Sequence, residues 1–261
     1  MKRHLQAEDV VAGYTATNVI DGLDLTVQAG SITALVGPNG SGKSTLLRTL
    51  GRLLKPRAGT VLLDGESLAH LSTAVVAKAL AVLPQAPPTP PALTVRQLVE
   101  HGRYAHLGPL GRPGTTDQDA IDQAMRTAGV EGMASRGVDT LSGGERQRAW
   151  IALTLAQQAP VLLLDEPTTF LDVGHQYEVL ELLAELRTSA ELTVVLVLHD
   201  LNQAARFADR LVVLQEGRIV ADGAPSDVLT PDLLISVFGI HAQVITDRRY
   251  GRPVCLWGET A

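Results

Sequence analysis

Apolar runs alternate along this chain with longer segments in which apolar residues recur at helical spacing. The runs are short and almost uninterrupted, which is typical of strands buried on both faces of a parallel sheet. Their alternation with helices predicts an α/β fold with a largely parallel sheet. We expect buried strands at 32–37, 81–85, 161–167 and 193–200, and helices at 43–54, 144–158, 174–188 and 200–208.

Other stretches show strand-like patterns outside this alternation. Three segments near the N-terminus are predicted to form antiparallel strands: 9–14, 19–27 and 59–65. The stretch RLVVLQEGRIVADG at 210–223 predicts a hairpin that turns at Glu216 and Gly217. From about residue 225 the pattern indicates short helices followed by one or two last strands.

A proline-rich stretch interrupts the alternation after residue 85. It cannot form a regular helix or a central strand, because five prolines lie between 84 and 91. Residues 95–140 then carry helical patterns and loops. We therefore predict a single domain of three parts: a core of 1–85 and 159–224, a mainly helical part at 86–158 and a C-terminal extension at 225–261.

Composition and charge restrict the class of protein. Apolar residues make up 45% of the chain and charged residues 19%, which fits a soluble globular protein with a sizeable core. The net charge of −6 argues against a dedicated nucleic-acid binder, because phosphate neutralisation needs clustered Lys and Arg. Cys255 is the only cysteine, so no internal disulfide can form and a cytosolic setting is expected.

The sequence predicts no membrane span. The purest apolar runs, such as VVLVL at 194–198, are far shorter than the roughly 18–20 residues that a span needs. The N-terminal MKRHL is not followed by an apolar stretch, so we expect no secretory signal. If the protein works at a membrane, we expect another chain to provide the membrane part.

The stretch GPNGSGKS at 37–44 matches the phosphate-binding loop G-x-x-x-x-G-K-[ST]. It lies in the expected context, because it follows a predicted strand and begins a predicted helix. Glycines in the loop let backbone N–H groups point at an anion, and the helix start adds a positive dipole end. Lys43 would reach the β- and γ-phosphates of a nucleotide, and the Ser44 hydroxyl would bind Mg²⁺. The structural alternative is a glycine-rich turn that only connects a strand to a helix.

Asp165 and Glu166 end the apolar strand VLLLDE at 161–166. Ligand chemistry in open α/β sheets lies at the carboxyl ends of the strands. Asp165 would help to hold Mg²⁺, and Glu166 would orient or deprotonate the attacking water. Taken alone, the two carboxylates could merely cap the element that follows Pro167.

Three single residues gain meaning from this context. Gln85 and His199 each end a predicted strand, so Gln85 could reach Mg²⁺ or water and His199 could bond the γ-phosphate. Tyr14, upstream of the phosphate loop, could stack on adenine. By itself, each has an ordinary structural explanation: a surface glutamine, a structural histidine or a core tyrosine.

A second anion-ready helix start lies in LSGGERQ at 141–147. Ser142 and Glu145 fit the S-x-x-E capping box of a well-capped helix. Capping does not account for Gly143 and Gly144, which cost helix stability but let an anion approach the backbone closely. Such a site is useful if it completes the nucleotide site of another molecule.

Together these motifs resemble the ATP-binding cassette (ABC) ATPases, in the family's order and over nearly the whole chain. GPNGSGKST matches the Walker A motif, VLLLDEP an extended Walker B and LSGGERQ the signature. Gln85 matches the Q-loop, His199 the switch histidine and FLD at 170–172 the D-loop. One departure is Glu145, since glutamine is commoner at this position of the family.

The resemblance implies a phosphate-loop NTPase core with an N-terminal antiparallel β subdomain and an inserted helical subdomain that carries the signature. It implies ATP and Mg²⁺ as cofactors and a head-to-tail homodimer, in which each signature holds the ATP on the partner's Walker A. The catalytic set would be Glu166, His199, Lys43 and Gln85, with Ser44, Gln85 and Asp165 at the metal. ATP would bind Tyr14, Gly37, Pro38, Asn39, Gly40, Ser41, Gly42, Lys43, Ser44 and Thr45. The signature would act through Leu141, Ser142, Gly143, Gly144, Glu145 and Gln147, and the D-loop through Leu171 and Asp172.

A finer resemblance is to the ATPases of iron–siderophore, haem and cobalamin importers, with the ferric-siderophore branch closest. It rests on stretches such as TVRQLVEHGRYAHLG, LLLDEPTTFLDVGHQYEVLELL and LHDLNQAARFADR. It implies an ATPase subunit at the cytoplasmic face of the cell membrane, with permease subunits docked at Gln85 and 86–110 and a separate substrate-binding protein.

Other classes stay open from the sequence. A soluble cassette protein acting on ribosomes or DNA would usually carry two cassettes or a coiled-coil insertion, and neither pattern is present. A phosphate-loop kinase would have no use for LSGG. A cassette exporter, or an importer of haem, cobalamin or another cargo, shares the motifs above.

Overall fold

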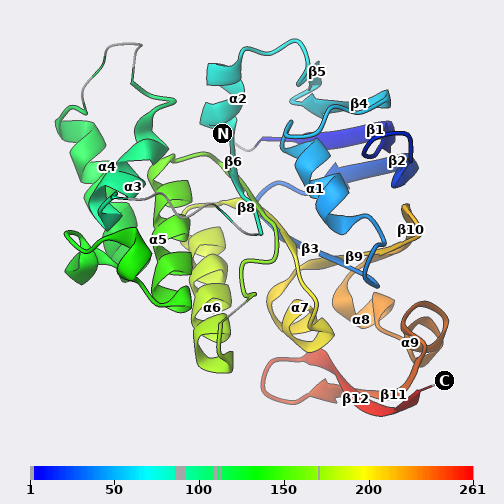
Figure 1. The fold of residues 1–261 in the computed structure, drawn as a ribbon. Helices are drawn as coiled ribbons and strands as arrows, with labels where there is room; N and C mark the ends of the chain where they lie inside the picture. Colours follow the sequence, from blue (N-terminus) through cyan, green and yellow to red (C-terminus); the bar gives the residue numbers. More distant parts are fainter. Residues whose placement is uncertain are drawn as a thin grey trace.

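A mostly parallel sheet forms the centre of the computed structural model, which describes residues 3–85, 87, 92–107, 111, 113–169 and 171–260. The strand order is β10, β9, β3, β8, β7, β6 (Figure 1). Every neighbouring pair is parallel except the edge hairpin of β9 and β10. The bounds are β3 (Ile32–Val36), β6 (Leu80–Leu83), β7 (Val161–Leu164), β8 (Thr193–Val197), β9 (Arg210–Gln215) and β10 (Arg218–Gly223). The α/β fold and the four buried strands predicted from the sequence are therefore confirmed.

Alternate residues of the central strands face two separate apolar clusters. In β3, Leu35 packs on one side of the sheet, whereas Ala34 and Val36 pack on the other. The uninterrupted apolar runs follow from this, because both faces of the sheet are covered. One face packs against α1 (Lys43–Leu50), and the other against α5 (Gly143–Ala156), α6 (Val173–Ser189) and α7 (Leu201–Phe207).

An antiparallel sheet from the N-terminal part of the chain covers the outer side of α1. Its strand order is β2, β1, β4, β5. The bounds are β1 (Leu5–Ala12), β2 (Ile20–Val27), β4 (Ala58–Leu63) and β5 (Glu66–Ser67). Leu46, Leu47 and Leu50 of α1 share one cluster with β1, β2 and the central sheet, so α1 is held between two sheets (Figure 1).

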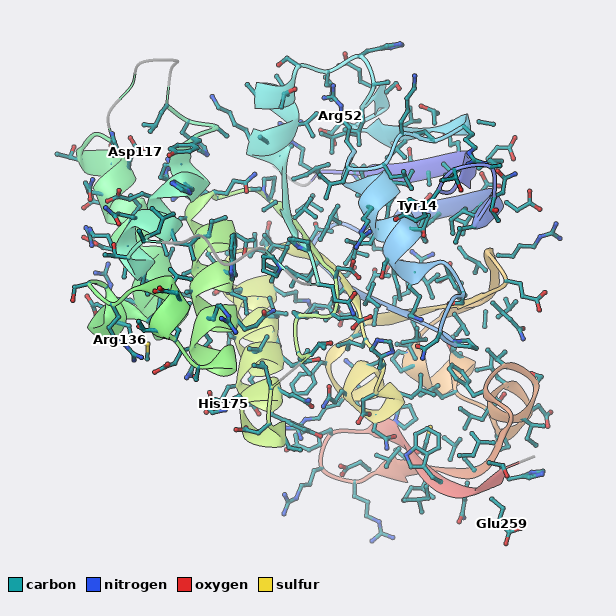
Figure 2. The ribbon with its side chains drawn as sticks, in the orientation of Figure 1. Tyr14, Arg52, Asp117, Arg136, His175 and Glu259 are labelled. Carbon is teal, nitrogen blue, oxygen red and sulfur yellow. The ribbon has the colours of Figure 1, made fainter. Side chains whose placement is uncertain are left out.

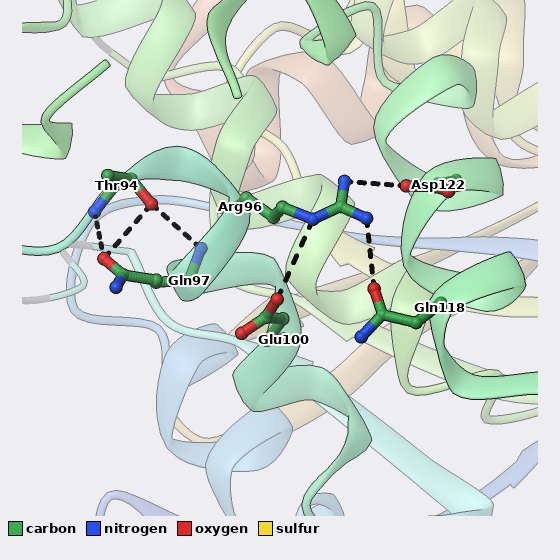
Figure 3. A network of polar contacts seen from close by, with 6 residues as sticks. All are labelled: Thr94, Arg96, Gln97, Glu100, Gln118 and Asp122. Carbon is green, nitrogen blue, oxygen red and sulfur yellow. Dashed lines mark hydrogen bonds and ion pairs between the residues drawn. The ribbon is translucent and has the colours of Figure 1, made fainter. Parts of the chain in front are cut away.

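A helical lobe lies to one side of the central sheet, on the left of Figure 1. It contains α3 (Val95–Glu100), α4 (Thr115–Thr127) and α5, with 3₁₀ turns η1 (His101–Arg103), η2 (Glu131–Met133) and η3 (Val138–Thr140). These helices share an apolar cluster of their own. Arg96 of α3 also bonds Asp122 at 2.7 Å and Gln118 at 3.0 Å, which ties α3 to α4 (Figure 3). The division of the chain at residues 86 and 159 stays a prediction.

The C-terminal extension packs against α7. It contains α8 (Pro225–Val228), α9 (Pro231–Phe238) and the hairpin of β11 (Ile240–Asp247) and β12 (Arg252–Thr260). Asn202 of α7 exchanges two hydrogen bonds with the Cys255 backbone, at 3.1 and 2.7 Å. The Cys255 thiol is buried, and burial raises its pKa to about 11. The single cysteine is therefore a packed thiol that ionises poorly.

Some elements differ from the pattern predicted by the sequence. The strand expected at 9–14 is β1, which runs over Leu5–Ala12. The helix expected at 43–54 ends at Leu50, because Arg52 adopts a left-handed φ of 58°. Leu53 N–H then bonds the Arg48 carbonyl and Arg52 N–H the Thr49 carbonyl, as in a Schellman motif. The helix α2 (Thr73–Ala79), capped by Ser72, was not predicted. Its seven residues are too few to show a clear helical period.

Helix length and composition bear on membrane insertion. Within the ranges that the structure describes, none of the helices combines the length and the apolar character needed to cross a bilayer.

The β9–β10 hairpin supports the loop at 37–42. Its turn residues Glu216 and Gly217 have φ of 48° and 77°, as a two-residue hairpin turn requires. Gly217 N–H bonds the Ser41 carbonyl at 3.1 Å, and Asp21 N–H bonds the Gly217 carbonyl at 3.3 Å. A Cβ on Gly217 would overlap the Val19 carbonyl oxygen. The turn thus fits closely between the loop and the start of β2.

We expect Gly217→Ala to lower the free energy of unfolding by about 3 kcal/mol, because left-handed strain adds to the overlap with the Val19 carbonyl. Gly65→Ala is the matched control: Gly65 also has a positive φ, of 81°, but its Cβ would meet open space. The control should lose only about 1 kcal/mol. Urea denaturation measures both, and equal losses would contradict the proposed fit.

Candidate functional site

Four parallel strands deliver the predicted residues to one edge of the sheet. Leu83 of β6 pairs with Leu164 of β7, Leu164 with Leu196 of β8, and Val197 of β8 with Leu35 of β3. The strands therefore end nearly level. Residues that follow these ends lie together: Gly37 after β3, Gln85 after β6, Asp165 and Glu166 after β7, and His199 after β8.

The phosphate loop runs from the end of β3 to the start of α1. Lys43 is buried, and its Nζ donates to the carbonyls of Gly37 at 2.9 Å and Pro38 at 2.8 Å. Burial lowers the pKa of Lys43, while Glu166 and Asp165 act against the shift. The ammonium is therefore held inside the loop, close to the two carboxylates.

The loop backbone requires glycine for two different reasons. Gly37 has a φ of 145°, and a Cβ there would overlap the Leu214 carbonyl of β9. Gly40 has a φ of 79°, but a Cβ there would meet open space. Gly37 is thus needed for packing against the sheet, whereas Gly40 leaves one side of the loop open to a ligand.

Asp165 joins the loop to β7. Its Oδ1 accepts a hydrogen bond of 2.7 Å from the Ser44 hydroxyl. Its Oδ2 is buried and has no hydrogen-bond partner among the described residues. Burial raises the pKa of Asp165, and Ser44 and Arg48 only partly oppose this. A buried carboxylate oxygen beside a hydroxyl is a donor set that suits a hard cation such as Mg²⁺.

Arg48 is a site residue that the sequence analysis missed. Its Nε lies 3.7 Å from Asp165 Oδ2, and its Nη1 donates to the Tyr14 hydroxyl at 3.1 Å. Arg48 stands one helical turn after Ser44, so both side chains reach the same carboxylate. The i,i+4 spacing on a predicted helix was the available signal. Tyr14 itself is 43% exposed and lies outside the residues that line the pocket described below.

Glu166 is the centre of the polar contacts at this edge. Its Oε2 accepts from Gln85 at 2.6 Å and from Thr169 at 2.9 Å, and its Oε1 lies 2.7 Å from His199 Nε2. Burial alone would raise the pKa of Glu166, but the bonds from His199 and Thr169 outweigh it and lower the pKa. Glu166 is thus ionised and held in one orientation. Thr169 is a second residue that the sequence analysis missed.

An open pocket connects these groups. It is lined by Val19, Asn39, Gly40, Gly42, Lys43, Ser44, Thr45, Glu166 and His199. The loop therefore forms one wall, and the ends of β7 and β8 form another. A negatively charged ligand in this pocket would meet backbone N–H groups and the Lys43 ammonium on one side and the Glu166–His199 pair on the other.

The LSGGERQ segment begins α5. Ser142 is the N-cap: its Oγ accepts from Glu145 N–H at 3.3 Å, and Glu145 Oε2 accepts from Ser142 N–H at 2.8 Å. The capping box predicted from the sequence is therefore present. Ser142 and Gly143 are exposed, while Leu141 is buried in the helical lobe. Both glycines lie in the first turn of the helix.

Contacts further along α5 reach the segment that follows β7. Gln147 Nε2 donates to the Pro167 carbonyl at 2.9 Å. A Cβ on Gly144 would lie in ordinary contact with Leu171 and His175. Asp172 caps α6 and accepts from His175 N–H at 3.0 Å. Phe170, part of the predicted D-loop, lies outside the described residues.

The structure brings one group of predicted residues together and leaves the other apart. Lys43, Ser44, Gln85, Glu166 and His199 meet through the contacts above. The hydrogen bonds of Ser142 instead stay within its own helix turn. In Figure 2, Arg136, which pairs with Glu145, lies in the helical lobe on the left, and Tyr14, which bonds Arg48 of α1, lies on the right. One chain therefore carries two anion-ready sites that do not meet.

Removal of the Ser44 hydroxyl tests the contact with Asp165. We expect Ser44→Ala to lower the free energy of unfolding by about 1–3 kcal/mol, because the buried carboxylate loses its hydrogen-bond donor. Ser44→Thr keeps a hydroxyl and serves as the control. Chemical denaturation with EDTA present measures both, and equal stability of Ser44→Ala and wild type would contradict the role of this bond.

Comparison with known proteins agrees with this geometry. The family described as "ABC transporter" matches residues 20–169. Among solved structures, one chain of an inward-facing metal-chelate type ABC transporter gives a TM-score of 0.84 at 28% identity, covering 99% of this chain and 98% of that one. The dimeric ABC cassette MJ0796 gives 0.75 at 29% identity, covering 84% and 98%.

Curated relatives match over nearly the full length. The chain is 50% identical over 252 residues to "Probable siderophore transport system ATP-binding protein YusV" of Bacillus subtilis (strain 168), covering 97% of this chain and 92% of that protein. It is 46% identical over 258 residues to "Ferric enterobactin transport ATP-binding protein FepC" of Escherichia coli (strain K12), covering 98% and 95%. The chain therefore belongs to the ABC transporter family, as one of its ATP-binding proteins.

Proposed function

We propose that this chain is the ATP-hydrolysing subunit of an importer for an iron chelate, most specifically a ferric siderophore. The observation that carries the proposal is the pairing of a phosphate-loop pocket with an exposed LSGG helix start that does not serve that pocket. The cargo rests on the names of the relatives, which are ATP-binding proteins of siderophore and ferric enterobactin transport. Haem or cobalamin is the alternative cargo.

ATP would bind with its phosphates in the loop at 37–45. Lys43 is positioned for this, because its ammonium lies beside the loop carbonyls of Gly37 and Pro38. The phosphate oxygens would become the partners of that ammonium and of the loop N–H groups. Tyr14 would stack on the adenine, and its exposed ring is available for this contact.

Ser44, Gln85 and Asp165 would hold Mg²⁺ through hydroxyl, amide and carboxylate oxygens. The bound ion would neutralise developing charge on the phosphates. Asp165 Oδ2 accepts no hydrogen bond among the described residues, and the Arg48 guanidinium stays 3.7 Å away. This supports the assignment, because a buried carboxylate oxygen without a hydrogen bond costs stability unless a partner is supplied.

Glu166 would orient the attacking water and accept its proton. The hydrogen bonds from Gln85, Thr169 and His199 keep this carboxylate ionised and fixed, as a base requires. His199 lies at the mouth of the same pocket and would bond the γ-phosphate. The preorganised polar groups need little rearrangement when charge develops.

The signature would complete the site of a second copy of the chain. Ser142, Gly143 and Gly144 would contact the γ-phosphate on the partner's loop, with Leu141, Glu145 and Gln147 supporting the helix start. Leu171 and Asp172 would lie at the same interface. Because ATP contacts both chains only when they meet, it would favour the closed dimer.

The region from Gln85 to 110 would receive the membrane partner. Gln85 bonds Glu166, and α3 begins just beyond the proline-rich stretch, so movement there has a direct route to the site. Residues 86, 88–91 and 108–110 lie outside the described residues. The permease subunits and a separate substrate-binding protein would complete the importer at the cytoplasmic face of the membrane. The net charge of −6 argues against a nucleic-acid partner.

The role of Glu166 leads to a test of hydrolysis. We expect Glu166→Gln to keep ATP binding but to slow hydrolysis at least about 10²-fold, because an amide cannot accept the proton of water. Uncleaved ATP should then hold two chains together. Light scattering with Mg-ATP measures the dimer, and a variant that stays monomeric at saturating Mg-ATP would count against the shared site.

Mixing of two inactive variants tests whether the signature acts in trans. Lys43→Ala removes the phosphate partner, and Gly143→Asp places a carboxylate where the partner's phosphate would approach. A mixed dimer holds one of its two sites with both parts intact, so it should show up to about half of a wild-type dimer's ATPase activity before cooperativity is considered. An equal mixture that pairs at random should therefore regain about a quarter.

The control mixture pairs Lys43→Ala with the double variant Lys43→Ala/Gly143→Asp, which offers no intact loop in any dimer. It should show no recovery. Equal activity in the two mixtures would refute action in trans.

A further inference from the structure

The negative charge within the signature has a dedicated partner. Glu145 stands three residues after the N-cap Ser142, and its carboxylate accepts from Arg136 Nη1 at 2.8 Å and Nη2 at 3.3 Å. The same carboxylate accepts from Ser142 N–H at 2.8 Å. The Arg136 side chain is 43% exposed and that of Glu145 is 22% exposed. The pair therefore lies at the surface, directly beside the exposed helix start.

The Glu145 carboxylate lies beside the exposed helix start, where its charge would repel an approaching phosphate unless another group neutralised it. Ser142 and Gly143 are exposed at the start of α5, and Glu145 touches the Ser142 backbone. The hydrogen bonds from Ser142 and Arg136 lower the pKa of Glu145 to about 2, so protonation cannot remove its charge at neutral pH. Like charges at close range repel each other strongly once water is displaced.

Arg136 is held by its own backbone in the position that reaches Glu145. Its N–H bonds the Met133 carbonyl, and its carbonyl accepts from Val95 N–H at 3.0 Å, in the first turn of α3. Its Nη2 also lies 3.3 Å from the Thr140 carbonyl, just before the signature. The backbone of Arg136 is thus fixed, and its guanidinium is held where it contacts Glu145.

We propose that Arg136 is a positioning residue for the signature: it neutralises Glu145 and holds the carboxylate against Ser142, so that the helix start can accept the partner's γ-phosphate. The proposal rests on the function in trans proposed above. With Arg136 present, the pair adds no net charge beside the phosphate. Without it, one uncompensated negative charge remains there.

A purely stabilising role would predict a different behaviour. Exposed ion pairs contribute little to stability, so loss of Arg136 should leave the lobe folded. If Arg136 only braced the loop before the signature, its replacement would do the same damage whether residue 145 were charged or neutral. The charge on Glu145 therefore separates the two explanations.

The test is a double-mutant cycle on the full chain, with ATPase activity as the first measurement. We expect Arg136→Gln to lower activity about tenfold in the presence of Glu145, by unscreened repulsion. In the Glu145→Gln background the same replacement should change activity no more than about twofold, because glutamine keeps the capping box but carries no charge. Equal losses in the two backgrounds would overturn the proposal.

The dependence of ATPase activity on ionic strength gives a second test. If Arg136 only stabilised the loop before the signature, the effect of its replacement would not depend on salt. The ratio of Arg136→Gln to wild-type activity should rise towards one between about 0.05 and 0.5 M salt, as repulsion is screened. Arg126→Gln is the matched control: Arg126 forms an exposed ion pair with Glu131 in the same lobe, 3.8 Å apart, away from the signature. It should keep wild-type activity at every salt concentration. A ratio that does not change with salt would contradict the proposal.

Measurement of ATP-driven dimerisation distinguishes the role of Arg136 from the action of the signature in trans, on which that role rests. In the Glu166→Gln background, light scattering should show that Arg136→Gln raises the ATP concentration needed for the dimer, and that adding Glu145→Gln restores it. If the Glu166→Gln chain itself forms no dimer with Mg-ATP, the action in trans fails. If it dimerises and Arg136→Gln has no effect, the role of Arg136 alone fails.

Discussion

The in-register pairing of four parallel strands is the constraint on which this site depends. Because β6, β7, β8 and β3 end nearly level, the residues just beyond their ends are delivered to one edge from four distant parts of the sequence. Gln85 and His199 can then each contact Glu166 directly. A shift of one strand by a residue would exchange the side chains that face the two apolar clusters and would displace the polar end of that strand from the site.

Several polar groups of the phosphate-loop site and of the signature helix start already have hydrogen-bond partners within the chain. Lys43 bonds carbonyls of its own loop, Glu166 accepts from neighbouring side chains, and the Ser142 helix start is capped by Glu145. Binding of ATP between two chains would therefore exchange internal hydrogen bonds for bonds to phosphate, at a modest net gain for each. Such an exchange suits a reversible closure better than a permanent one.

The sequence predicts the parts of the site that depend on local pattern. Strands buried on both faces give unbroken apolar runs, so the positions of Asp165, Glu166 and His199 at strand ends could be read directly. Contacts that depend on tertiary packing could not be read. Arg48 meets Asp165, which is far away in the sequence, only because the end of β7 lies near α1.

Two further features were also missing from the sequence analysis, the contact of Arg136 and the early end of α1. Arg136 reaches Glu145 only because its loop is bonded to the first turn of α3. The early end of α1 depends on Arg52 in a left-handed conformation, which glycine would have signalled but arginine does not. The Arg136 contact was therefore set by another part of the fold, whereas the end of α1 was set locally, at a residue type that does not signal it.

The central claim is that the LSGG helix start of one chain meets the phosphate loop of another, and a crosslink between two single-cysteine chains tests it most directly. Cys255 is first replaced by serine in both chains; one chain then carries Asn39→Cys and the other Ser142→Cys, at positions that are exposed in the single chain. Each chain also carries Glu166→Gln, so that bound ATP persists. The account predicts a disulfide-linked product of twice the 27.7 kDa chain mass that forms in the mixture only when Mg-ATP is present. No linked product with Mg-ATP, or the same yield without it, would contradict the account.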